Sequence, residues 1–210
     1  MNTAHTALLL AAYLTLVGEL IFLHVPSVAS TLQILSTGSH TDAGYSERYA
    51  ALFRYSRTTK ILLFVAPIGV IYALFAYPLV VVVQGTDPLG DYLFIPVDSL
   101  QTAGAATLVV GRIVTLSATS SIRINNRQLG ESFFLHTTGL YKWTRNPGLV
   151  GMYLFVAGIW LMMPSLTMAV GIVVYIAYMD FKIRMEEDFL SRKFGEHYDE
   201  YRRLTGRYLW

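Results

Sequence analysis

The sequence has no cysteine among its 210 residues, and Asp, Glu, Lys and Arg together make up only 14% of it. The lack of cysteine excludes disulfides, thiolate zinc sites and a cysteine nucleophile. The sequence also has no glycine-rich Rossmann fingerprint. Its five histidines are too scattered for a metal site, so we expect no bound metal. The net charge of +2 gives no indication of a nucleic-acid partner.

What the sequence has in quantity is apolar residues, at 54%, with a mean hydropathy of +0.46. This composition is not typical of a water-soluble domain. In lipid, the backbone must satisfy its own hydrogen bonds, and long uninterrupted apolar runs favour helices over a closed barrel. We therefore expect an all-α polytopic membrane helix bundle.

Apolar segments set the number of spans. Three windows are long enough to cross a hydrocarbon core of roughly 30 Å: Thr6–Val25, Ile61–Val83 and Val97–Ser117. A further segment, Asn146–Met179, contains no charged residue, and as one helix it would measure about 50 Å. Pro164 lies near its middle, where a tight turn and a new helix would give two short spans. The sequence predicts five transmembrane helices in one domain, residues 1–210, with three spans in 1–120 and the rest in 121–210.

Basic residues test this count, because segments rich in Lys and Arg stay in the cytosol. They fall after spans one, three and five: Arg48, Arg54, Arg57 and Lys60; Arg123, Arg127, Lys142 and Arg145; Lys182, Arg184, Arg192, Lys193, Arg202, Arg203 and Arg207. The N-terminus, residues 84–96 and the Pro164 turn have none. We expect the N-terminus outside and the C-terminus in the cytosol, in the inner membrane of a bacterium or the endoplasmic reticulum of a eukaryote.

A cytosolic C-terminal helix is predicted over residues 185–203, where apolar and aromatic side chains recur at helical spacing. These are Leu190, Phe194, Tyr198 and Tyr201. Gly195 is expected to bend this helix. Glu186 and Glu187 precede Leu190 by four and three residues, so at least one of them shares its packed face.

Arg112, in span three, is the only Lys or Arg inside a predicted span, and Glu19, in span one, is the main acidic residue there. Charges within the bilayer are costly and by default suggest function. Two interpretations stay open: an ion pair that fixes these spans together, or a role at a substrate cavity.

The densest group of polar, aromatic and turn residues, 137–147, comes directly before span four. Pro147 suits the first turn of a helix, and Asn146 suits its N-cap. Beside Arg145, the free N–H groups of that helix start could bind an anionic group. The alternative is an interfacial anchor, in which Trp143 and Tyr141 lie at the lipid headgroups.

A second group of charged and aromatic residues follows about forty residues later, and the two groups together form a recognisable pattern. Residues 139–151 read Gly-Leu-Tyr-Lys-Trp-Thr-Arg-Asn-Pro-Gly-Leu-Val-Gly, residues 186–190 read Glu-Glu-Asp-Phe-Leu, and residues 194–201 read Phe-Gly-Glu-His-Tyr-Asp-Glu-Tyr. This pattern resembles the isoprenylcysteine carboxyl methyltransferase family, and phospholipid N-methyltransferases share its broad form. The resemblance covers about residues 125–207. It implies an S-adenosylmethionine site at the cytosolic ends of the last two spans and the C-terminal helix.

By position, the resemblance implies that Glu186 holds the amino group of the cofactor and that residues before and at the start of span four line the rest. These are Asn126, Phe133, Phe134, Leu135, His136, Tyr141, Asn146, Pro147 and Leu149. The sequence departs from the family pattern twice. Asn146 stands in place of the usual His, and Leu149 in place of a common Tyr, which loses an aromatic or hydroxyl contact.

Methyl transfer from a sulfonium needs in-line approach and exclusion of water more than covalent help, so no catalytic triad is expected. A carboxylate acceptor is already ionised, whereas an amine must lose a proton to a base, for which Glu187, neutral His136 and Tyr141 are candidates. Arg145 or the helix start complements the cofactor carboxylate. The family's basic residue facing substrate corresponds to either Lys182 or Arg184.

We therefore expect an integral membrane methyltransferase whose acceptor is a lipophilic small molecule, a prenylated compound or a membrane lipid, methylated on a carboxylate, amine or thiol. Its site would face the cytosol. A nicotinamide-dependent membrane reductase of the steroid-reductase type has a similar Tyr, Arg and Pro pattern, and a non-catalytic membrane scaffold is the third interpretation. The sequence does not indicate the oligomeric state.

Overall fold

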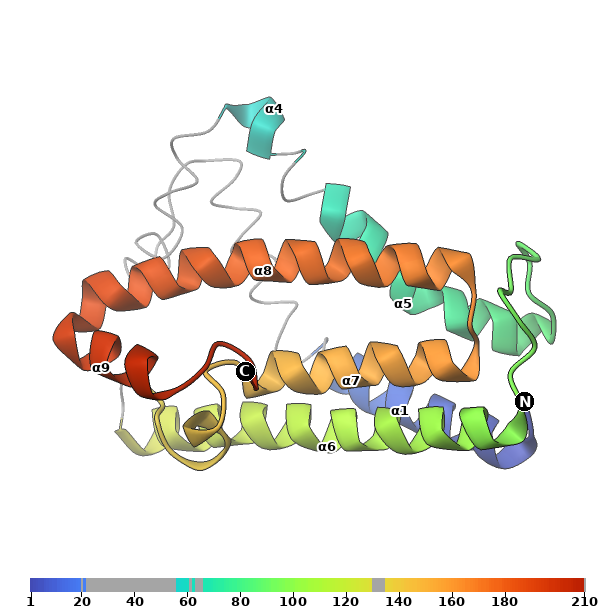
Figure 1. Cartoon of the computed structure of the whole chain (residues 1–210), viewed down its shortest axis with the longest axis horizontal. Helices are drawn as coiled ribbons and strands as arrows, with labels where there is room; N and C mark the ends of the chain where they lie inside the picture. Colours follow the sequence, from blue (N-terminus) through green and yellow to red (C-terminus); the bar gives the residue numbers. More distant parts are fainter. Residues whose placement is uncertain (20, 22–55, 61, 63–65, 130–134, 210) are drawn as a thin grey trace. The chain divides into compact units, whose positions relative to one another are not determined.

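The computed structural model describes residues 1–19, 21, 56–60, 62, 66–129 and 135–209, without the side chains of Arg57, Lys60 and residues 123–129. Figure 1 shows the helices, which are α1 (Thr3–Glu19), α4 (Arg57–Lys60), α5 (Ala66–Gln84), α6 (Asp98–Leu129), the 3-10 helix η4 (Gly139–Lys142), α7 (Pro147–Met162), α8 (Leu166–Phe194) and α9 (Glu196–Leu204). These residues contain no β-strand beyond one isolated bridge, between Tyr92 and Ser165. The predicted all-α class is confirmed.

Three of the described helices are long and apolar enough to cross a membrane: α5, the Asp98–Ile122 part of α6, and α8. The apolar helix α7 is shorter, at 16 residues. These helices support a membrane protein, while the number of five spans and the orientation stay predictions. The first predicted span coincides with α1 as far as Glu19 and then lies largely outside the described residues.

The predicted break near Pro164 is confirmed, because α7 ends at Met162 and α8 begins at Leu166. The N–H of Met163 still bonds to the carbonyl of Ile159 at 2.9 Å, which closes α7. The hydroxyl of Ser165 accepts a hydrogen bond from the N–H of Met168 at 3.1 Å and so caps α8. Two separate helices therefore replace one that would be too long for a single crossing.

Two helices extend further than the sequence suggested. α6 continues past the apolar window to Leu129, where a polar cytosolic segment was expected. The C-terminal helix expected over residues 185–203 is instead the continuation of α8, followed by a separate α9. Backbone hydrogen bonds do not stop where the side chains become polar, so α8 continues to Phe194. Gly195 follows it, and its φ of +53° breaks the helical geometry, which confirms the bend expected there.

Two compact units divide the described residues. The first unit draws on Met1–Leu8, Phe94–Pro164 and Leu190–Trp210, and the second on Leu9–Leu93 and Ser165–Phe189. The candidate site residues are divided between these two units.

In the first unit, α6 and α7 run antiparallel along each other (Figure 1). Glycines line their contact: a Cβ at Gly104 would lie 2.7 Å from the carbonyl oxygen of Gly158, and one at Gly151 would lie 2.7 Å from that of Gly111. Such distances are below any ordinary contact, so only glycine permits this approach. Close backbone packing of small residues is the usual means by which helices associate in lipid.

In the second unit, α5 packs on the first half of α8. A Cβ at Gly171 would lie 2.7 Å from the side chain of Leu74, which the glycine therefore accommodates. The rings of Phe75 and Tyr175 meet edge to face at 5.9 Å between centroids. These contacts fix α5 against the first half of α8, and the far end of α8 carries the acidic residues of the candidate site.

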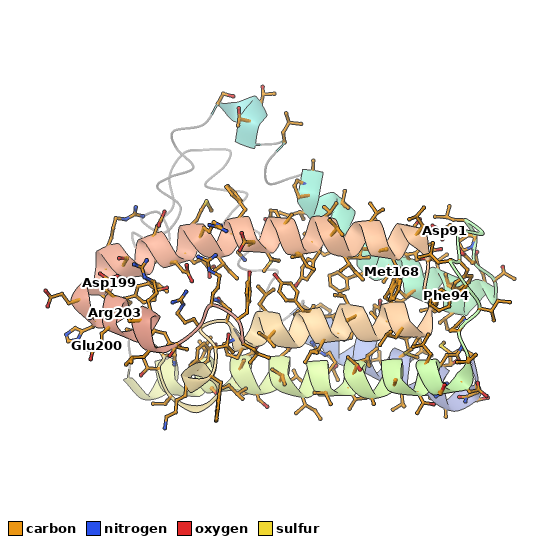
Figure 2. All side chains as sticks on the ribbon, viewed as in Figure 1. Asp91, Phe94, Met168, Asp199, Glu200 and Arg203 are labelled. Carbon is orange, nitrogen blue, oxygen red and sulfur yellow. The ribbon has the colours of Figure 1, made fainter. Side chains whose placement is uncertain are left out.

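The loop after α5 caps the start of α8, where Figure 2 shows Asp91. The carboxylate of Asp91 accepts hydrogen bonds from the N–H of Thr167 at 2.7 Å and from its hydroxyl at 2.5 Å. The hydroxyl of Tyr77 donates to both Asp87 and Asp91. A carboxylate at a helix start satisfies free N–H groups and complements the helix dipole.

Candidate cofactor site

The predicted site residues fall into two groups, one in each unit. The first unit contains Leu135, His136, Tyr141, Arg145, Asn146, Pro147 and Leu149, and the second contains Lys182, Arg184, Glu186 and Glu187. Phe133 and Phe134 lie outside the described residues, as does the side chain of Asn126. Whether the two groups meet stays a prediction.

The start of α7 has the geometry that its sequence predicts. Pro147 is the first helical residue, and the carbonyl of Asn146 accepts hydrogen bonds from the N–H groups of Leu149 and Val150, both at 3.1 Å. Asn146 therefore occupies the N-cap position. The predicted N-cap position is confirmed, although the Asn146 side chain makes no capping hydrogen bond.

His136 and Tyr141 form an aromatic pair at the cytosol-facing end predicted for this unit. Their ring centroids are 5.7 Å apart with planes inclined by 38°, and both side chains are half-buried. Burial lowers the pKa of His136 below its ordinary value, which favours the neutral imidazole at pH 7. A neutral imidazole beside a phenol offers both an aromatic surface and a proton acceptor.

A short segment at the C-terminus, residues 205–209, which we call the C-terminal strap, runs beside the first turn of α7 (Figure 1). The carbonyl of Arg207 accepts hydrogen bonds from the hydroxyl of Thr144 at 3.0 Å and from the side-chain amide of Asn146 at 3.1 Å. The backbone N–H of Arg145 donates to the carbonyl of Gly206 at 2.9 Å. Three consecutive residues before α7 thus bond to the strap.

The guanidinium of Arg145 lies at the C-terminal end of α9. It donates to the carbonyls of Arg202 at 3.0 Å and Thr205 at 3.2 Å. A cation at this end of a helix satisfies carbonyls that have no partner within the helix and complements the helix dipole. In this structure Arg145 therefore acts on the protein backbone.

Tyr201 on α9 is hydrogen-bonded to the backbone of the aromatic pair. Its hydroxyl donates to the carbonyl of Tyr141 at 2.7 Å, and its side chain is buried. Burial raises the pKa of Tyr201 to about 12, partly opposed by the charge of Arg145. The phenol therefore keeps its proton and remains a donor across the physiological range.

In the second unit, the acidic pair lies on the last turns of α8. Glu187 is buried, with 7% of its surface exposed, while Glu186 is half-buried. The prediction that at least one of them faces the packed side is confirmed. Of the two basic candidates, Arg184 is exposed and forms a 2.8 Å ion pair with Asp180, whereas Lys182 is half-buried.

The two charges inside the predicted spans are both buried. Arg112 is 4% exposed, and its guanidinium carbon lies 5.7 Å from the ring centroid of Phe155 on α7. Such a cation–π contact stabilises a guanidinium away from water. Glu19 is 7% exposed and belongs to the other unit, so both interpretations, an ion pair with Arg112 and a role at a substrate cavity, stay open.

Sequence reasoning missed the partners of Thr144, Tyr201 and the strap. Their contacts join side chains to backbone carbonyls about 60 residues away. Since every residue has a backbone carbonyl, the sequence does not indicate which one serves as the acceptor. The ring of Tyr208 also packs at 5.8 Å from that of Tyr153 on α7. Only the aromatic character of the tail hinted at this role.

Comparison with known protein families gives a match over part of the chain. Residues 100–197 match the family model described as phospholipid methyltransferase. The match confirms the resemblance to the membrane methyltransferase superfamily and indicates a membrane methyltransferase in general. Comparisons with curated proteins and with solved structures give no match.

Proposed function

Since residues 100–197 match the phospholipid methyltransferase family, we propose that the chain transfers a methyl group from S-adenosylmethionine to a lipophilic acceptor at the cytosolic membrane surface. The observation that carries this proposal is the extent of the match, which includes both the His136 to Pro147 cluster and the Glu186–Glu187 pair. Isoprenylcysteine-like or phospholipid-like acceptors both fit an apolar bundle that substrate enters from the bilayer.

The described residues offer groups that fit each part of this cofactor. The half-buried rings of His136 and Tyr141 suit the adenine, and the half-buried carboxylate of Glu186 suits the ammonium group. Arg145 bonds to α9, and the N–H groups of Leu149 and Val150 bond to the carbonyl of Asn146. The N–H of Gly148, in the first turn of α7, is therefore the backbone group assigned to the cofactor carboxylate. The bound cofactor would supply the methyl group as a sulfonium, and water exclusion by the apolar helices would favour its transfer.

The residues around the site would serve the acceptor differently according to its chemistry. A carboxylate needs no base and would be positioned by a cation, for which half-buried Lys182 is better placed than the solvent-exposed Arg184. An amine would give its proton to neutral His136 or to Glu187. Comparing acceptors across Lys182→Met and His136→Gln variants would separate these two cases.

Binding of S-adenosylhomocysteine to the purified full-length protein tests the proposal. Titration calorimetry should give saturable binding to the wild type and a loss of at least tenfold in Glu186→Ala, because an ion pair to the cofactor ammonium is removed. Asp188→Ala, a change at an exposed neighbour on the same helix, is the matched control. Equal affinity in Glu186→Ala and wild type would contradict the assigned role of Glu186.

The absence of cysteine makes the meeting of the two clusters directly measurable. Cysteines introduced at Lys142 and Asp188, both exposed, would be the only thiols in the chain. A short bismaleimide should link them within one molecule if both clusters shape one pocket. Lys142 paired with Leu89, an exposed residue in the loop after α5, is the negative control, and equal linking of both pairs would count against a shared pocket.

A further inference from the structure

The described hydrogen bonds from residues 144–146 to the C-terminal tail all have a backbone carbonyl as their acceptor. Thr144 and Asn146 share the carbonyl of Arg207, at 3.0 and 3.1 Å, and the N–H of Arg145 bonds to Gly206 at 2.9 Å. Backbone acceptors keep their place whatever side chains the tail carries. The strap is thus held by its main chain, and the residues that hold it are those of the predicted cofactor motif.

The same tail also holds the aromatic pair. The hydroxyl of Tyr201 donates a hydrogen bond to the carbonyl of Tyr141, which fixes the backbone of η4 at that residue. The ring of Tyr141 is the one that pairs with His136. The guanidinium of Arg145 in turn fixes the C-terminal end of α9, and Tyr201 lies in the last turn of this helix. The aromatic pair and the start of α7 therefore depend on one connected set of hydrogen bonds.

The strap is anchored at its other end by a ring contact. Tyr208 lies 5.8 Å from Tyr153, about two turns into α7. Aromatic pairs of this kind contribute more than the area that they bury. The strap is therefore attached to α7 at two levels, by hydrogen bonds at its start and by rings further along.

From this arrangement we propose that Asn146, Arg145 and Tyr201 are positioning residues, which act on the cofactor through the C-terminal strap and α9 rather than by touching it. This inference rests on the proposed function and names the tail as part of the cofactor site. It also explains how Asn146 serves at the position where the family usually has His: its amide need only reach a backbone carbonyl.

A double-mutant cycle tests the inference. The affinity for S-adenosylhomocysteine is measured in full-length wild type, Asn146→Ala, Tyr208→Ala and the double variant. Each single change should weaken binding roughly five- to tenfold, the factor expected for one lost hydrogen bond or ring contact. The double variant should be no weaker than the weaker single one, because both changes release the same strap.

Two outcomes contradict the inference. If the effects of Asn146→Ala and Tyr208→Ala multiply, Asn146 contacts the ligand independently of the strap. If Tyr208→Ala leaves the affinity unchanged, the strap has no part in the site. The control is Leu204→Ser, at the end of α9 with 81% of its surface exposed, which should bind as wild type does.

Hydrogen exchange gives a readout that does not need the ligand. In Tyr208→Ala, the amide of Arg145 should exchange faster, since its acceptor on Gly206 is released, while amides in the middle of α6 should be unchanged. Tyr201→Phe, which keeps the ring, should lower the affinity for S-adenosylhomocysteine without changing the exchange rate of the Arg145 amide. If wild type binds no S-adenosylhomocysteine yet shows this exchange pattern, the proposed function fails while the structural role of the strap stands.

Discussion

Replacing Gly158 with Ala should force α6 and α7 apart. The added Cβ would lie 2.5 Å from the backbone nitrogen of Leu108, 2.6 Å from the carbonyl oxygen of Gly104 and 2.8 Å from the Cβ of Leu108. None of these atoms belongs to a flexible side-chain end. Since ordinary contact begins at 3.4 Å, one helix must retreat by about 1 Å along this part of the seam.

The cost follows from two opposing effects. Overpacking of this kind costs about 1–3 kcal/mol and more where backbone must move. Alanine recovers about 1 kcal/mol through its higher helix propensity. Because backbone must move here, the overpacking cost lies in the upper part of that range, about 2–3 kcal/mol. We therefore expect Gly158→Ala to lose about 1–2 kcal/mol, which corresponds to a fall of roughly 2–8 °C in the melting temperature.

Thermal unfolding in detergent measures this change against two matched glycines. Gly148, also on α7, has its nearest atom at 3.8 Å from an added Cβ, and Gly69 on α5 has none within 4 Å. Gly148→Ala and Gly69→Ala should be neutral or slightly stabilising, because they gain propensity without a clash. If Gly158→Ala melts at the same temperature as Gly148→Ala, the close seam is refuted.

Three other changes have definite outcomes. Arg145→Ala should destabilise the protein by about 1–3 kcal/mol in a melting experiment, because two carbonyls at the end of α9 lose a charged donor; full stability would contradict that contact. Asp91→Ala should cost about 1–2 kcal/mol through the lost cap of α8, whereas Asp98→Ala, at an exposed helix start, should cost less. The folded pKa of His136 is lowered, so stability should fall as pH drops below 6.5, and His136→Gln should lose less on going from pH 7 to 5.5; an equal loss in both proteins would show that His136 is not responsible.

The sequence was sufficient for the helical class and for the break between the last two helices. Asn146–Met179 has no charge and is too long for one crossing, so a turn was required, and Pro164 located it. The end of α6 was not predictable in the same way, nor was the unbroken course of α8 to Phe194, although Gly195 was expected to bend the helix there. Hydropathy reports where a helix leaves lipid, not where its hydrogen bonds stop, and α8 stops at Gly195.

Within the candidate site, the sequence identified residues better than their roles. Pro147 and Asn146 occupy the predicted positions at the start of α7, yet the Asn146 side chain bonds to the tail and not to its own helix. Either Arg145 or the helix start was expected at the cofactor carboxylate, and here Arg145 binds the end of α9. Both contacts depend on where the chain folds back after about 60 residues, which local spacing cannot reveal.

The most direct test of the account is methyl transfer itself. Purified full-length protein is incubated with S-adenosylmethionine labelled in its methyl group, together with membrane lipid extract or small prenylated thiols, and the organic phase is counted. The account predicts label in a lipophilic product, with a strong loss in Glu186→Ala and little change in Asp188→Ala. Folded wild-type protein that neither labels any such acceptor nor binds S-adenosylhomocysteine would contradict it.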